Sequence, residues 1–308
     1  MTHHIFSVKD GKTTLDGQPL LVKGLRCSNS LVSDVATADL ITHLDLYASY
    51  GVNTVSVFLM GSRFGDIKGY NEDASLNPAV MTRLAGLIEA ADRRGMVVLV
   101  GCLYWSTSQA KWPAWTQDHA NLAVSNTLQW LKDHDYRNVF VDVDNEGMAR
   151  AEAGFDNQQL VLAGKAVDER IPIATNYRGA PPPPEADLTI HHSEEAPGKP
   201  FIESEGSPSI VPDGQIHYWG PYSKVDGLYA YINVGVYSEA MKQNQIEITR
   251  QHLDAGKGYM LASTWLQAAP PQGPNHRLGG MGSVDHPGVR WWMEWLRETY
   301  GPYKPAKV

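Results

Sequence analysis

Eight short apolar segments, each with the length and composition of a β-strand, alternate with helical patterns along this chain of 308 residues. In chain order they read LLVKGLR, NTVSVFLM, MVVLVGCLY, NVFVDVD, IPIATN, LTIHH, KPFIES and YMLASTW. Alternation of strand and helix is typical of a parallel sheet, and eight such units close into a barrel. The sequence therefore predicts a single α/β domain over residues 1–308, a (β/α)8 TIM barrel.

The helical patterns are clearest after the first two strand segments. Thr37 is expected to cap a helix that carries Leu40 and Leu44 on one face, and Asn77-Pro78 is expected to open the next helix. Further helical patterns cover 117–133, 157–168, 238–255 and 287–300.

Other segments depart from the regular pattern. Residues 1–20 carry turn signals at two Asp-Gly pairs and predict a short hairpin that covers the bottom of the barrel. The connections RGAPPPPEAD, after the fifth strand, and SEEAPGK, after the sixth, are not expected to form helices, because the first is proline-rich and the second is too short. Residues 207–237 form a long connection, which predicts an active-site loop.

The charge balance excludes several classes of partner. A net charge of -8 and a pI near 5.7 argue against nucleic acid and acidic membrane surfaces, and they suit a neutral sugar. The chain has no apolar segment long enough to span a membrane and no leader pattern, so we expect a cytoplasmic protein, or a secreted one if a signal segment has been removed. The two cysteines, Cys27 and Cys102, are expected to be buried free thiols.

Two of the strand segments end in carboxylates followed by glycine. VFVDVDNEG brings Glu146 to the end of the fourth strand, and KPFIESEG brings Glu203 and Glu205 to the end of the seventh. Because the active sites of such barrels lie at the carboxyl ends of the strands, these acids can face one another across a shared opening. Two facing carboxylates are the minimum that glycosidic bond cleavage needs.

These motifs resemble those of the retaining glycoside hydrolases of clan A, the cellulase-like (β/α)8 enzymes. The resemblance rests on Asp142-x-x-Asn145-Glu146, on a Glu five residues after Pro200, and on Trp265 at the end of the eighth strand. It runs from VKGLR to STWLQ. Ser56 stands where the cellulase family has an Arg, and CLYW where it has a His, so the resemblance is to the clan and not to that family.

The resemblance implies a role for each acid. Glu146 would be the general acid and then the general base, and a Glu of the seventh strand would be the nucleophile. Asn145 would hydrogen-bond the sugar hydroxyl beside the anomeric carbon. The negative nucleophile would raise the pKa of Glu146 and keep it protonated. Glu146 could instead be a solvated acid in a turn.

Glu203 and Glu205 both remain candidates for the nucleophile, because alternate residues of a strand face the same side. The spacing from Pro200 and a position nearer the opening favour Glu205. The other acid would then be buried and paired with Lys23 or Arg26.

Further residues are candidates for substrate binding. Arg26, on the first strand, and Arg63, after the second, could place a cation beside the nucleophile. Aromatic and imidazole side chains of the expected upper loops could stack on sugar rings or hydrogen-bond sugar hydroxyls, and they are Tyr104, Trp105, His217, Trp219 and Trp265. Tyr and Trp are also common packing residues in loops.

His191 and His192 raise an alternative. Adjacent strand residues face opposite sides, so only one of the two is expected to reach the site, where it would donate a hydrogen bond to the sugar or the nucleophile. A metal-dependent barrel hydrolase could still collect one of them with Asp142, Asp144 and Glu205. A non-catalytic carbohydrate-binding barrel is a third interpretation. Our preferred prediction is a retaining hydrolase of β-linked glycosides or oligosaccharides, with no metal and no cofactor.

Overall fold

The computed structural model describes residues 2–61, 67–105, 111–206, 239–263, 266 and 289–305. Its centre is a closed barrel of eight parallel strands, and each strand pairs with its neighbour in chain order until β11 closes on β4. The strands are β4 (Lys23–Arg26), β5 (Thr54–Phe58), β6 (Val97–Leu103), β7 (Val139–Asp144), β8 (Ile173–Thr175), β9 (Leu188–Ile190), β10 (Phe201–Gly206) and β11 (Gly258–Ala262). The predicted (β/α)8 barrel is confirmed.

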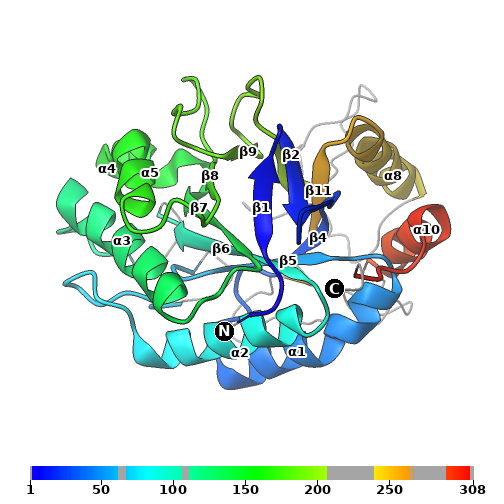
Figure 1. The fold of residues 1–308 in the computed structure, drawn as a ribbon, viewed down its shortest axis with the longest axis horizontal. Coiled ribbons are helices and arrows are strands. Elements are labelled where there is room, and N and C mark those ends of the chain that lie inside the picture. The colour runs from blue at the N-terminus through cyan, green and yellow to red at the C-terminus, as the bar shows by residue number, and fades with distance from the viewer. Residues whose placement is uncertain are drawn as a thin grey trace.

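Helices surround the barrel on several sides (Figure 1). They are α1 (Asp34–Ser49), α2 (Pro78–Asp92), α3 (Gln117–Asp133), α4 (Met148–Ala153), α5 (Asn157–Lys165), α8 (Glu239–Asp254) and α10 (Arg290–Tyr300). The expected cap Asn77 accepts the Ala79 N–H and opens α2 as predicted. Helix α1 begins earlier than expected, because Ser33 caps it by accepting the Ala36 N–H, and Thr37 lies inside its first turns.

The connections around β9 are irregular, as the proline run and the short loop predicted. No helix forms in the described residues between β8 and β9 or between β9 and β10. Loops therefore take the place of helices on this side of the barrel. In contrast, a one-turn 3-10 segment (Asn145–Gly147) and the short helix α4 follow β7 directly, and neither was predicted.

The N-terminal segment closes the end of the barrel opposite to the carboxyl ends of the strands. Strands β1 (Phe6–Lys9), β2 (Lys12–Leu15) and β3 (Gln18–Pro19) form a small antiparallel sheet. Phe6 is fully buried and stacks on Phe140 of β7 with ring centroids 5.0 Å apart. It belongs to the same apolar cluster as Leu99 and Met260 of the barrel interior. Burial of one such ring contributes roughly 1.5–3 kcal/mol.

Three further sequence predictions concern the cysteines, membrane-spanning segments and the connection at 207–237. Cys27 and Cys102 are buried free thiols, as predicted. None of the described helices has the length and apolar composition that crossing a membrane requires. The predicted active-site loop at 207–237 lies outside the described residues.

Candidate functional site

The turn after β7 positions Glu146 by means of an unusual backbone conformation. Glu146 has φ 54° and Gly147 has φ 64°, so two consecutive residues are left-handed. For a residue other than glycine this conformation costs on the order of 1–3 kcal/mol, and such strain is concentrated at functional sites. A Cβ at Gly147 would lie 2.6 Å from the Cβ of Tyr177, so the turn packs tightly against the residues that follow β8.

Two buried aspartates of β7 hold this turn in place. Asp144 accepts the backbone N–H groups of Ala149 (2.9 Å) and Arg150 (3.0 Å), which anchors the start of α4. Asp142 accepts a hydrogen bond from Asn176 Nδ2 at 3.1 Å and another from the Asp144 N–H. Burial raises the pKa of Asp142 to about 6 and that of Asp144 to about 7. Both acids are therefore engaged in holding the turn and the end of β8.

Arg26 of β4 contacts residues at the ends of both β7 and β10 inside the barrel. One of its terminal nitrogens lies 3.0 Å from Glu205 Oε2, and the same nitrogen donates to Asn145 Oδ1 at 2.9 Å. The side chains of Arg26 and Glu205 are 0% exposed. The guanidinium also lies over the rings of Phe58 and Tyr104, at 4.8 and 5.8 Å from the centroids. Asn145 Oδ1 accepts from Asn176 as well, and its Nδ2 donates to Glu146 Oε1 at 3.4 Å, so one Nδ2 hydrogen remains to donate to a sugar hydroxyl.

Glu203 has a different partner from the expected one. It pairs neither with Lys23 nor with Arg26 but with His191, whose Nδ1 lies 2.6 Å from Glu203 Oε1. The same oxygen accepts the Glu205 backbone N–H at 2.8 Å. Its position one layer below Glu205 in β10 puts Glu203 next to the end of β9, because β9 and β10 are adjacent in the barrel.

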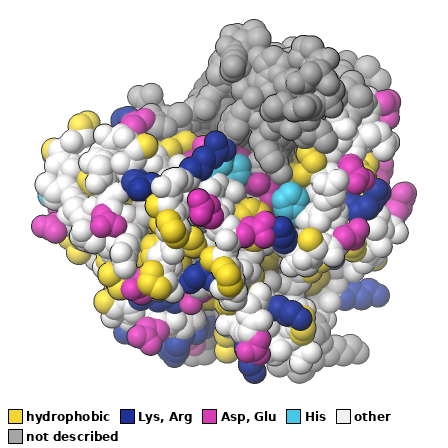
Figure 2. All heavy atoms as spheres, turned by 90° about the horizontal axis from the view of Figure 1, so that it is seen from above, with side chains coloured by type: hydrophobic (Ala, Val, Ile, Leu, Met, Phe, Trp, Pro, Cys, Tyr) yellow, Lys and Arg dark blue, Asp and Glu magenta, His cyan; other side chains and the backbone are white. Residues whose placement is uncertain are grey.

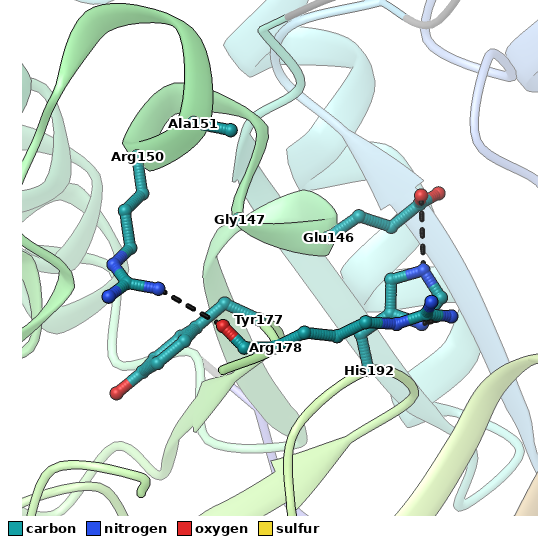
Figure 3. Close-up of a pocket in the computed structure, with 7 residues that line it drawn as sticks. All are labelled: Glu146, Gly147, Arg150, Ala151, Tyr177, Arg178 and His192. Atoms are coloured by element: carbon teal, nitrogen blue, oxygen red, sulfur yellow. Dashed lines mark hydrogen bonds and ion pairs between the residues drawn. The ribbon is translucent and has the colours of Figure 1, made fainter. Parts of the chain in front are cut away.

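His191 and His192 both reach the site, which corrects the expectation that only one could. Strand β9 ends at Ile190, and His191 takes a left-handed conformation with φ 46°, so strand alternation no longer applies. Their rings stack with centroids 3.9 Å apart. His192 Nε2 lies 3.4 Å from Glu146 Oε2, as Figure 3 shows, and Arg178 donates to His192 Nδ1 at 2.9 Å.

One cluster of possible metal ligands is found among the described residues. Glu146, His191 and His192 each offer a ligand atom, and these atoms lie within 4.8 Å of one another. Because Arg178 donates to Nδ1 of His192, a neutral His192 carries its proton on Nε2, where a metal would need a lone pair. The aspartates of the metal alternative, Asp142 and Asp144, are engaged with Asn176 and with the α4 backbone. The cluster suits hydrogen bonding better than metal binding.

The two catalytic candidates, Glu146 and Glu205, are electrostatically coupled. Burial is the main cause that raises the pKa of Glu205 to about 8, and the negative charge of Glu146 raises it further, against the opposing effect of Arg26. Burial also opposes the ionisation of Glu146, but the hydrogen bond from His192 and the charges of His191 and Arg26 outweigh it and lower its pKa to about 2.

The two carboxyl groups therefore titrate as an interacting pair, in which the charge of Glu146 raises the pKa of Glu205. The resemblance implied that the nucleophile would raise the pKa of Glu146, whereas the surroundings of Glu146 lower it. The difference arises because two histidines close on Glu146 from the end of β9, and their convergence was not expected.

The structure places the remaining predicted binding residues in three groups. Tyr104 is buried beside Arg26. Trp105 is 4% exposed and packs between Trp115 and Phe155, with ring centroids 5.9 and 5.1 Å away, so it lies in the core and not where a sugar would stack. The other four lie outside the described residues, and they are Arg63, His217, Trp219 and Trp265.

A cavity of about 470 Å³ opens beside Glu146 and contains residues that the sequence argument missed. Arg150, Tyr177 and Arg178 line it together with Glu146 and His192 (Figure 3). In Figure 2, histidine side chains lie beside basic and acidic ones on one face of the molecule, so groups of both charges gather there. Asn176, Tyr177 and Arg178 directly follow the fifth strand, so the strand-end rule that marked Glu146 could also have marked them.

No known family profile matches this sequence, and no curated protein resembles it significantly. Solved structures do resemble its fold. A beta-glucanase from Saccharophagus degradans, in complex with cellotetraose, aligns over 97% of this chain and 94% of its own, with a TM-score of 0.60 and 14% identity. A family 5 glycoside hydrolase from Bacteroides vulgatus aligns over 96% of this chain and 70% of its own, with a TM-score of 0.59 and 12% identity.

An exo-beta-1,4-mannosidase from an Opitutaceae bacterium aligns over 91% of this chain and 60% of its own, with a TM-score of 0.58 and 15% identity. At these identities the likeness is one of architecture. The resemblance inferred from the motifs is thus confirmed at the level of the fold, and this chain has the (β/α)8 barrel that these glycoside hydrolases share.

Proposed function

We propose that this protein is a retaining glycoside hydrolase that acts on β-linked oligosaccharides or glycosides. The observation that carries the proposal is the pair of Glu146 and Glu205, which project from the ends of β7 and β10, both interact with the charge of Arg26, and influence each other's pKa. A pair of carboxyl groups in which one is protonated and one is ionised is what the double-displacement reaction requires.

The closeness of the two carboxyl groups supports retention. Retaining enzymes place them about 5 Å apart, whereas inverting enzymes separate them by about 6.5–9.5 Å so that a water molecule fits between. The electrostatic interaction between Glu146 and Glu205 favours the shorter separation. The structures of similar fold include a beta-glucanase and an exo-beta-1,4-mannosidase, which supports a β-linked substrate.

In the first step, Glu205 attacks the anomeric carbon while Glu146 protonates the departing oxygen. A bond forms between that carbon and a Glu205 oxygen, and the glycosidic bond breaks. For this step Glu146 must be protonated and Glu205 must be ionised. Arg26, at 3.0 Å from Glu205, stabilises the nucleophile once it is ionised.

In the second step, water replaces Glu205. Glu146, now ionised, accepts a proton from the attacking water, and the bond between sugar and Glu205 breaks. The protons balance, because the one that Glu146 gave to the leaving group is regained from water. Asn145 Nδ2 can donate to the hydroxyl next to the anomeric carbon in both steps.

Covalent trapping tests the proposal. A 2-deoxy-2-fluoro glycoside with a good leaving group should form a stable ester, because fluorine slows breakdown of the intermediate more than the leaving group slows its formation. Peptide mapping should place the sugar on Glu205. Glu205→Gln should remove the label, and Glu203→Gln should retain it. A label on Glu203 would reverse the assignment, and inversion of the product followed by NMR would exclude a nucleophile.

A further inference from the structure

The cavity beside Glu146 carries an unusual concentration of positive charge. Arg150, in α4, and Arg178, after β8, both line it, although the chain as a whole has a net charge of -8. Elsewhere Arg83, Arg94 and Arg170 each pair with an aspartate. Within the part of the chain that the structure describes, neither Arg150 nor Arg178 forms an ion pair with an acid. Among the described residues that line the cavity, the one carboxylate is Glu146, and its ion-pair contact is with His192.

Contacts within the cavity hold both guanidinium groups in position. Arg150 donates to the Arg178 backbone oxygen at 3.1 Å and lies over the Tyr177 ring at 4.9 Å from its centroid. Arg178 donates to His192 Nδ1 at 2.9 Å. Figure 3 shows the Arg150 side chain beside Tyr177 and the Arg178 side chain reaching to His192 below Glu146, and a dashed line joins Arg150 to the Arg178 backbone oxygen. Each guanidinium has five N–H donors, so these contacts leave several for a ligand.

The position of the cavity identifies the part of the substrate that it would hold. In the proposed function, Glu146 protonates the oxygen of the departing group, so the departing group must lie on the Glu146 side. Glu146 and His192 form one wall of the cavity. The guanidinium groups therefore face the leaving group and not the sugar that becomes attached to Glu205.

We propose that this cavity is a leaving-group subsite for a substrate that carries anionic oxygens, a carboxylate as in a uronic acid or a sulfate ester, bound by Arg150 and Arg178. This inference rests on the proposed function and specifies its substrate class. Guanidinium groups match the geometry of both anions, because they donate two parallel hydrogen bonds. A carboxylate on the departing group would also replace the acid that these arginines lack within the described structure.

Matched aryl glycosides test the subsite. For the sugar that the enzyme accepts, kcat/KM is measured with phenyl, 3-carboxyphenyl and 3-sulfonatophenyl leaving groups, compared after correction for phenol acidity. The anionic leaving groups should be favoured by roughly tenfold at low salt, and the preference should shrink as salt screens the charges. Comparison of kcat/KM between the 3-carboxyphenyl and 3-sulfonatophenyl leaving groups distinguishes a carboxylate subsite from a sulfate subsite.

Variants test whether the two arginines cause the preference for anionic leaving groups. Arg150→Gln and Arg178→Gln should each lower the ratio of anionic to neutral kcat/KM, and Arg150→Lys should restore part of it. Arg93→Gln is the control, because it removes the same charge from an exposed site at the end of α2. A ratio near one in the wild type, or a ratio that the cavity variants leave unchanged, overturns the inference.

A binding measurement separates this inference from the proposed function. NMR titration with 3-hydroxybenzoate and with phenol requires no turnover. Tighter binding of 3-hydroxybenzoate that is lost in Arg150→Gln supports the subsite, and equal binding of the two contradicts it. Hydrolysis of phenyl glycosides without anion preference rejects only the subsite, whereas failure to label Glu205 rejects only the hydrolase mechanism.

Discussion

His191 Nδ1 lies 2.6 Å from Glu203 Oε1, and the two side chains are 2% and 4% exposed. Burial opposes the charge on His191, but Glu203 outweighs it and raises the pKa of His191 to about 9. His191 Nε2 has no hydrogen-bond partner among the described residues. The pair therefore holds a positive imidazolium beside Glu205 and Glu146, both of which contribute to raising its pKa. In the proposed function, Glu203 is therefore a positioning residue for Glu146 and Glu205.

Glu203→Gln should reveal this role. The variant keeps the shape of the side chain but removes its charge, so the pKa of His191 should fall toward its ordinary value, as followed by NMR. We expect kcat to fall about 10–100-fold with a smaller change in KM, as for other residues that orient the reacting side chains through a hydrogen bond without touching the substrate. The free energy of unfolding should fall by about 1–3 kcal/mol. Glu298→Gln, on the exposed side of α10, is the matched control. An unchanged His191 titration would contradict the assignment.

Glu146→Ala should affect substrates unequally. Poor leaving groups need a proton in the transition state and should lose about 10²–10⁴-fold in turnover, whereas aryl glycosides of acidic phenols should lose far less. Azide should partly restore the second step, because it attacks without needing a general base. Kinetics over a series of aryl glycosides measure both effects. Uniform loss without rescue would mean that Glu146 only supports the turn after β7.

Stability should fall as pH rises from about 6.5 to 9. His191 has a pKa of about 9 in the folded protein against 6.5 unfolded, so its contribution is complete below pH 6.5 and is lost as pH rises through 9. Glu205, raised from 4.5 to about 8, acts in the same direction between those two values. Thermal unfolding against pH should flatten in His191→Gln and not in His3→Gln, a change at an exposed residue. The His191 contribution is on the order of 3 kcal/mol. A pH dependence that His191→Gln leaves unaltered would show that His191 is not its source.

Chelation should leave activity unchanged. Glu203 pairs with Nδ1 of His191 and raises the pKa of that ring to about 9, Arg178 donates to Nδ1 of His192, and Arg26 adds positive charge nearby, all of which oppose metal binding by the cluster of Glu146, His191 and His192. Activity is measured after exhaustive treatment with EDTA and again after zinc or manganese is added. Loss of turnover that either metal reverses would replace the glycosidase mechanism with a metal-dependent one.

Local patterns were sufficient to predict the architecture. Each strand segment is apolar and flanked by turn residues, and α2 begins at a cap that the sequence contains in full, Asn77-Pro78. Strand and helix periodicity depend on neighbouring residues in the chain, so both can be read without the fold. The start of α1 was misplaced because Ser33 and Thr37 are both good caps, and only the geometry of the preceding loop selects Ser33.

The positions of the acids were also predictable, because the ends of parallel strands must meet at one end of a barrel. This rule brought Glu146 and Glu205 together from segments about sixty residues apart. Their partners were not predictable in the same way. Whether Arg26 reaches Glu205 or Glu203 depends on its depth in the barrel, which strand stagger sets.

The sequence alone thus determined which chemical groups stand at the strand ends, since strand length and turn residues are local properties. The tertiary structure decided how those groups are charged and where they point. His191 turns into the site because the chain leaves β9 in a left-handed conformation, and the two histidines then lower the pKa of Glu146, while burial raises that of Glu205. A pKa depends on burial and on neighbours from other strands, so no single segment of the sequence contains it.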